Sequence, residues 1–217
     1  MSYKTILFDL DGTITDSGEG IMHSVVYALK KMKVKIPDQK ELYSFIGPPL
    51  TDSFKRLYHF DDLKASLAVE YYRDYYQKQG IYENHVYAGI SELLINLKAA
   101  GCTLYIATSK PEIYAKQILT HFDLSSYFDG IYGASLDGGR SRKGDVIQYA
   151  LKKSAITHFE ETLMVGDRSH DIIGAKENRL TSIGVLYGFG DQAELELAGA
   201  DYIVETPKEI EKIIINN

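Results

Sequence analysis

The sequence is poor in the residues and runs that mark several protein classes. It holds one cysteine in 217 residues, Cys102, so it forms no internal disulfide and offers no second thiolate for a zinc site. Its six histidines lack the i,i+4 pairing of a helical zinc site. No apolar stretch approaches the ~20 residues of a membrane span, and the N-terminus MSYKTILFDLDG lacks the apolar segment of a signal peptide. These absences predict a cytoplasmic protein with no membrane partner.

The charge balance argues against a protein that binds along a nucleic acid polymer. Lys and Arg number 24 against 30 Asp and Glu, which gives a net charge of −6 at pH 7. Proteins that bind along phosphate backbones carry excess positive charge, so a nucleic acid polymer is not an expected partner. With 45% hydrophobic and 25% charged residues, the composition is that of a globular protein with a substantial core.

Short apolar runs alternate with amphipathic helical patterns along most of the chain. Buried strands are expected at residues 4–8, 103–107, 130–132, 162–165 and 182–186, and helices at 90–99, 113–121, 145–153 and 171–178. This alternation predicts an α/β fold: a Rossmann-like parallel sheet with helices on both faces and catalytic groups at the carboxyl ends of the strands.

Residues 17–85 break the alternation. They show helical patterns interrupted by Ile36-Pro37 and Gly47-Pro48-Pro49, without a convincing strand. We therefore expect a small all-helical domain inserted after the first strand, with residues 1–16 and 86–217 forming the α/β core. The insertion has ten basic and nine acidic residues. A weakly positive insertion beside an acidic core suits an anionic ligand, although a solvated face would look the same.

The first acidic cluster is Asp9-Leu10-Asp11-Gly12-Thr13, directly after the first predicted strand. In an extended chain residues i and i+2 point the same way, which would crowd the two carboxylates. A hard cation such as Mg²⁺ relieves that repulsion. A calcium loop starting at Asp9 is excluded, because its twelfth position is Gly20 instead of Glu. A simple Asp-Gly turn at Asp11 stays an alternative.

A second acidic cluster, Gly166-Asp167-Arg168-Ser169-His170-Asp171, follows the strand at 162–165. Asp171 is expected one helical turn after Asp167 and on the same face. A helix N-cap with an acid in its first turn would give the same pattern. If both clusters meet at one edge of the sheet, they form a four-carboxylate pocket that requires a metal ion.

Two further segments have the complementary character for an anionic ligand. Thr108-Ser109-Lys110-Pro111 places two hydroxyl groups and helix-start amides after the strand at 103–107, where a phosphate can accept hydrogen bonds. The same residues would also make a good helix cap. Lys143 begins a predicted helix, and a lone lysine is usually a surface residue.

In this order, the four segments resemble the haloacid dehalogenase-like superfamily of phosphotransferases. DLDGT at 9–13, Thr108, Lys143 and GDRSHD at 166–171 carry the resemblance. FIGPPL at 45–50 and the Thr-Ser-Lys-Pro turn are similar to the phosphoglycolate phosphatase-like branch, whose members often have Asn where this chain has Ser109. The resemblance spans the whole chain and implies that the helical insertion is a mobile cap.

The resemblance also implies a role for each site residue. Asp9 would attack phosphorus to form an aspartyl-phosphate, Asp11 would act as acid and then base, and Lys143 would balance phosphoryl charge. Mg²⁺ would be held by Asp9, the backbone carbonyl of Asp11, and Asp167, with Asp171 acting directly or through water. The residues expected to bind substrate are Gly12, Thr13, Thr108, Ser109, Lys110 and, from the cap, Arg56; Tyr43 and residues 47–49 are further candidates in the cap.

The sequence thus predicts a Mg²⁺-dependent phosphatase, monomeric or homodimeric, that acts on a small phosphorylated metabolite such as phosphoglycolate or a nucleoside 5'-monophosphate. Two alternatives stay open: a sugar-phosphate mutase on the same scaffold, and a non-hydrolytic phospho-acceptor signalling domain. A carbon–halogen hydrolase is disfavoured because it leaves Asp11 without a function. Four tyrosines in the insertion, Tyr71, Tyr72, Tyr75 and Tyr76, fit packing better than a base-stacking platform.

Overall fold

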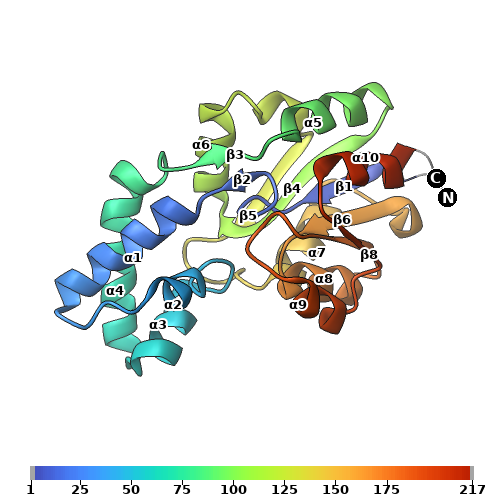
Figure 1. The fold of residues 1–217 in the computed structure, drawn as a ribbon. Coiled ribbons are helices and arrows are strands. Elements are labelled where there is room, and N and C mark those ends of the chain that lie inside the picture. The colour runs from blue at the N-terminus through green and yellow to red at the C-terminus, as the bar shows by residue number, and fades with distance from the viewer. Residues whose placement is uncertain (1–2, 216–217) are drawn as a thin grey trace. The chain divides into compact units, whose positions relative to one another are not determined.

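The computed structural model describes residues 3–215. The chain folds into two compact units. One comprises the chain up to Thr15 together with the chain from Val86 onward, and the other is Asp16–His85. Figure 1 shows the helices and strands of each unit. No helix in the described range is long and apolar enough to cross a bilayer.

The first unit is built on a six-stranded sheet in the order β5-β4-β1-β6-β7-β8. Every neighbouring pair is parallel. The strands are β1 (Thr5–Phe8), β4 (Thr103–Pro111), β5 (Gly130–Ala134), β6 (Thr162–Gly166), β7 (Thr181–Val185) and β8 (Tyr202–Val204). This arrangement confirms the predicted Rossmann-like α/β fold.

Helices follow the strands as parallel crossovers require. They are α5 (Ile90–Ala99), α6 (Glu112–His121), α7 (Lys143–Lys153), α8 (Ser169–Glu177), α9 (Gln192–Ala198) and α10 (Pro207–Ile215), with 3₁₀ turns η2 (Ser125–Tyr127) and η3 (Phe159–Glu161). The sequence pattern missed β8, α9 and α10. β8 is a three-residue edge strand, and α9 buries only Leu195, so neither leaves a clear apolar repeat in the sequence.

The core of this unit lies on the two faces of the sheet. Leu7 and Met164 point to one face, where they pack with Val146 of α7 and Ala175 of α8. The alternate residue Phe8 points to the opposite face and meets the ring of Phe128 edge-on at 6.5 Å. Full burial of each such side chain contributes about 1.5–3 kcal/mol to the stability of the folded state. This packing fixes the positions of the strands and of their carboxyl ends.

The second unit is mainly helical. It contains α1 (Gly18–Met32), α2 (Gln39–Tyr43), α3 (Leu50–Tyr58), α4 (Asp62–Tyr75) and a π-helical turn, η1 (Tyr76–Gly80). Two-residue strands β2 (Thr15–Asp16) and β3 (His85–Val86) pair where the chain leaves and re-enters the first unit. The predicted breakers fall between helices, with Pro49 as the N-cap of α3. Tyr72 and Tyr76 are buried and stacked at 5.4 Å, so they are packing residues.

Candidate active site

The topology of the sheet fixes where a ligand is expected. From β1 the chain passes to β4 on one side and later to β6 on the other, so the strand order changes direction at β1. Open parallel sheets bind ligands beyond the carboxyl ends of the strands at such a switch point. β1 ends at Phe8 and β6 at Gly166, which places Asp9 and Asp167 directly after neighbouring strands.

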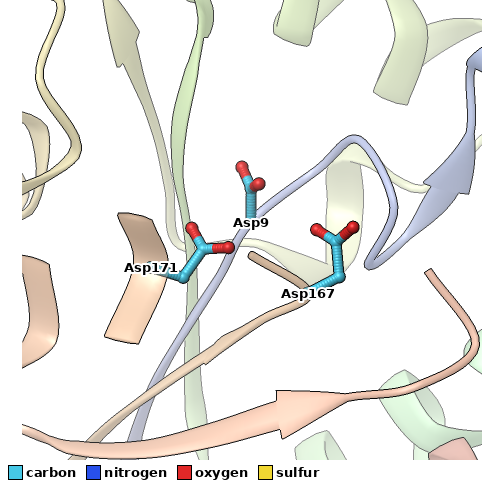
Figure 2. Close-up of side chains that lie close together, drawn as sticks. All are labelled: Asp9, Asp167 and Asp171. Carbon is cyan, nitrogen blue, oxygen red and sulfur yellow. The ribbon is translucent and has the colours of Figure 1, made fainter. Parts of the chain in front are cut away.

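Three carboxylates meet at this point (Figure 2). Asp9, Asp167 and Asp171 are buried, and each contributes an oxygen that lies within 4.8 Å of the others. Asp171 sits in the first turn of α8, where its Oδ2 accepts a hydrogen bond from the backbone N–H of Arg168 at 3.0 Å. Asp171 therefore combines the two interpretations of its motif, because one oxygen caps the helix and the other faces the cluster.

Lys143 supplies the positive charge beside these carboxylates. Its Nζ lies 2.7 Å from Asp9 Oδ1 and 2.7 Å from Asp171 Oδ1, and it donates to the carbonyl of Ala107 in β4 at 3.1 Å. Burial lowers the pKa of Lys143, but the carboxylates of Asp171 and Asp9 outweigh burial and raise it above its ordinary value. Lys143 is thus a fixed cation.

The carboxylates carry more charge than Lys143 can balance. Burial, followed by the neighbouring charges of Asp171 and Asp9, raises the pKa of Asp167 well above its ordinary range. The pKa of Asp171 is raised to about 6 by burial, with Asp9 adding to the effect and Lys143 opposing it. The cluster therefore takes up protons unless another cation is supplied.

Asp11 departs from the expected arrangement. The strand ends at Phe8, and the chain then turns, with the amides of Ile14 and Thr15 both donating to the carbonyl of Leu10 at 2.9 and 3.0 Å. The i and i+2 rule for extended chains no longer applies there. Asp11 is outside the carboxylate cluster and instead forms an ion pair with Lys110, Nζ to Oδ2 at 2.8 Å. The pocket therefore contains three carboxylates and not the four that were expected. Asp11 is paired with Lys110 instead.

Gly12 and Thr13 border the cluster from the same turn. Gly12 has φ +82°, and a Cβ there would overlap the carboxylate of Asp167. Both the backbone conformation and the space therefore require glycine. Thr13 is buried, and its hydroxyl donates to Asp167 Oδ1 at 3.5 Å, a long bond. The structure thus gives both residues a contact to Asp167, while their predicted part in substrate binding stays a prediction.

The Thr108-Ser109-Lys110 segment lies at the carboxyl end of β4. Its pairing with β5 shifts register between Thr108 and Pro111, an irregularity of the kind found at a β-bulge. Thr108 is buried, and its Oγ1 accepts from the backbone N–H of Lys110 at 3.2 Å. Pro111 is the last residue of β4 and the N-cap of α6.

Comparison with known proteins identifies the family of this chain. The family model of haloacid dehalogenase-like hydrolases matches residues 6–185. The chain belongs to the haloacid dehalogenase-like hydrolase family. This confirms the resemblance drawn from the four sequence motifs.

Two curated relatives and one solved structure are similar to this chain over most of its length. A 5'-nucleotidase from Pseudomonas aeruginosa is 47% identical over 195 residues, which cover 90% of this chain and 88% of that protein. The crystal structure of a predicted phosphatase from Clostridium acetobutylicum matches with a TM-score of 0.96 and 50% identity over 100% of both chains. Tyrosine-protein kinase PtkA from Mycobacterium tuberculosis is 38% identical over 87% of this chain and 64% of its own length. The enzyme class predicted from the sequence, a phosphoric monoester hydrolase, agrees with the first two.

Sequence reasoning missed the loop after β7, which also contacts the site. The backbone N–H of Phe189 donates to Asp167 Oδ2 at 2.8 Å, and the hydroxyl of Tyr187 donates to the carbonyl of Thr13 at 3.0 Å. The two glycines of Tyr187-Gly188-Phe189-Gly190 completed no nucleotide-binding fingerprint, so the segment carried no functional signal. What distinguishes this segment is its pair of closely spaced glycines, Gly188 and Gly190, next to the buried carboxylate of Asp167.

We expect Gly188→Ala to test this loop. A Cβ at Gly188 would overlap the carbonyl oxygen of Gly12 and the Cβ of Asp167, so the loop must move away from the acid. Overpacking of this kind costs about 1–3 kcal/mol of unfolding free energy in urea denaturation. Gly139→Ala is the control, because the nearest atom to its Cβ lies at 3.4 Å. Equal stability of the two variants would contradict the close contact.

The remaining predicted residue, Arg56, lies in the second unit. Its Nη2 donates to the carbonyl of Ser44 at 3.3 Å. That contact belongs to the packing of the helical unit. The expected role of Arg56 in substrate binding, like that of Tyr43, therefore stays a prediction.

Proposed function

We propose that this protein is a Mg²⁺-dependent phosphatase that hydrolyses a small organic phosphomonoester through an aspartyl-phosphate. The observation that carries the proposal is the buried group of Asp9, Asp167 and Asp171 with Lys143, at the switch point of the sheet. A carboxylate at the end of β1, beside a fixed ammonium group, is the expected form of a nucleophile for a phosphoryl group.

The residues present fit a magnesium ion. All three cluster residues offer carboxylate oxygens, the donor type that hard divalent cations prefer, and their burial leaves charge that Lys143 alone does not balance. Asp9 and Asp167 would hold the ion with the backbone carbonyl of Asp11, and Asp171 would act directly or through water. When bound, Mg²⁺ supplies charge neutralisation for the phosphoryl oxygens.

The protein's own residues divide the chemistry between them. Asp9 attacks phosphorus as the bond to the leaving oxygen breaks, and Lys143, 2.7 Å from Asp9, balances phosphoryl charge. The leaving oxygen takes a proton from Asp11. Water then attacks the aspartyl-phosphate and returns a proton to Asp11, so one water is consumed for each alcohol and phosphate released. The Thr108 hydroxyl and the amide of Ser109 are expected to hold the phosphoryl group.

The relatives guide the choice of substrate. A 5'-nucleotidase at 47% identity supports a nucleoside 5'-monophosphate, and the sequence resemblance supports phosphoglycolate. Both are small phosphomonoesters that a helical cap could enclose to exclude water. We assign that enclosing role to the unit Asp16–His85, with Arg56 as a candidate contact to the substrate.

A panel assay tests the function. Phosphate release is measured at fixed Mg²⁺ from nucleoside 5'-monophosphates, phosphoglycolate, sugar phosphates and phosphotyrosine. We expect catalytic release, highest for a small phosphomonoester. Interconversion of sugar-phosphate isomers with little phosphate release would assign a mutase instead. A stable aspartyl-phosphate without turnover would assign a phospho-acceptor domain.

We expect Asp11→Asn to slow both half-reactions, because asparagine can neither donate nor accept the proton. General acid–base groups contribute about 10²–10⁴-fold. With p-nitrophenyl phosphate, whose leaving group needs little protonation, the variant should accumulate phosphoenzyme, since loss of the base delays water attack. Acid quench of enzyme treated with labelled substrate measures that species. Wild-type turnover by the variant would remove Asp11 from the mechanism.

A further inference from the structure

Lys110 is a second buried lysine at the site, and the mechanism above gives it no task. Its side chain is 5% exposed, and its Nζ lies 2.8 Å from Oδ2 of Asp11, whose side chain is 14% exposed. A buried ammonium group is costly without a paired charge, so this contact is a fixed feature of the site. Lys110 lies in the part of β4, between Thr108 and Pro111, where the pairing with β5 shifts register.

We propose that Lys110 is a positioning residue, which holds Asp11 so that its proton is carried on Oδ1 and directed to the leaving oxygen. The inference rests on the proposed phosphatase function and adds a residue to it. It also replaces the expectation that Lys110 binds the substrate.

The donor and acceptor inventory carries the argument. An ammonium group offers three hydrogens and accepts none, so an Asp11 oxygen that faces it can only accept. When Asp11 is protonated, its hydrogen is therefore excluded from Oδ2 and lies on Oδ1. Within residues 3–215, Oδ1 of Asp11 is buried and has no hydrogen-bond partner. One oxygen is occupied by the lysine, and the other is available for the reaction.

The proton balance follows from this placement. As the ester bond breaks, the hydrogen on Oδ1 passes to the leaving oxygen, and Oδ2 keeps its contact with Lys110. When water attacks the aspartyl-phosphate, a water hydrogen returns to Oδ1. Lys110 keeps its three hydrogens throughout and touches neither the phosphorus nor the leaving group.

A leaving-group series tests this role. We expect Lys110→Met to slow phosphoenzyme formation, measured by acid quench, in proportion to the need for an acid: less than about threefold for p-nitrophenyl phosphate and about 100-fold for an alkyl phosphate, within the usual range for acid catalysis. Hydrolysis of the phosphoenzyme needs Asp11 as a base whatever the leaving group, so that step should slow equally across the series. KM should change little across the series. Lys110→Arg should recover part of the loss, because it restores a buried donor to Oδ2.

Two controls keep the result interpretable. Lys116→Met removes an exposed lysine that pairs with Glu112 of the same helix and should leave the whole series unchanged. In the Asp11→Asn background, adding Lys110→Met should cost less than threefold on the alkyl phosphate, because a residue that acts through Asp11 loses its effect when Asp11 is absent. Thermal melts report whether each variant folds.

Three outcomes overturn the inference. An equal loss in the rate of phosphoenzyme formation for good and poor leaving groups would indicate a general structural or charge effect. A rise in KM with unchanged kcat would return Lys110 to substrate binding. Additive losses in the double variant would separate it from Asp11. Failure of the proposed function is distinguishable, because the wild-type protein would then release no phosphate from any member of the series.

Discussion

Asp9→Asn should abolish turnover while the protein stays folded. The carboxylate of Asp9 is the only group in the cluster that directly follows β1, and asparagine there lacks the charge and nucleophilicity to attack phosphorus. Removing a covalent nucleophile commonly lowers kcat by about 10⁶-fold. Phosphate release and trapping of labelled phosphoenzyme should both fall to background.

The fold should survive because the change relieves a conflict. Asp9 is one of the charges that raise the pKa of Asp167 and Asp171, so its loss lessens the repulsion in the buried cluster. The substitution also removes the buried ion pair of Asp9 with Lys143, which opposes this gain, so in EDTA we expect the melting temperature of Asp9→Asn to stay close to that of the wild type. Asp145→Asn, an exposed position on α7, is the matched control and should retain full activity. Normal phosphate release by a folded Asp9→Asn protein would refute the mechanism.

The parts of the fold that could be predicted are those with strong local patterns. β1 and β6 are continuous apolar runs followed at once by an acid, and parallel topology alone brings their ends together. β8 and α9 could not be found in this way. They are short elements at the edge of the sheet, and their position depends on contacts that are distant in sequence, such as that of Leu195 of α9 with Gly184 of β7.

The residues of the site also divide into those that local sequence patterns predict and those that depend on contacts distant in sequence. Asp171 was predicted from the acidic cluster that follows the strand at 162–165, whereas Lys143 was predicted only through the family resemblance. The ion pair of Lys110 with Asp11 was missed because it depends on two local departures from regular structure, the turn after β1 and the register shift in β4. The contact of Phe189 with Asp167 uses a backbone N–H, which any residue provides, so no residue type marks it.

Removal of Mg²⁺ should abolish phosphate release as completely as the Asp9→Asn substitution does. EDTA is expected to abolish phosphate release, and added Mg²⁺ to restore it. Ca²⁺ takes six to eight ligands in a flexible geometry, whereas Mg²⁺ requires near-ideal octahedral coordination. We therefore expect Ca²⁺ to occupy the carboxylates without supporting turnover. Equal rates with the two ions would contradict a site built for a small octahedral cation.

The pH dependence of unfolding stability tests the carboxylate cluster and its metal binding without an activity assay. Without metal, the pKa of Asp171 is raised from 3.8 to about 6, and that of Asp167 is raised as well, so the folded protein binds more protons than the unfolded chain. Stability of the metal-free protein must then fall as pH rises from about 4 through 6 and beyond. Mg²⁺ requires the deprotonated carboxylates and removes that penalty, so its effect should grow over the same range.

Thermal melts at pH 5 and pH 8, each with EDTA or with Mg²⁺, measure this difference. At about 100 times its Kd, Mg²⁺ should stabilise the protein by about 2.7 kcal/mol at pH 8, or about 5–10 °C in Tm for a chain of this size. At pH 5 protons compete for the carboxylates, and the shift should be much smaller. A shift independent of pH would mean that the ion binds away from Asp167 and Asp171, because only ligands that give up protons couple binding to pH.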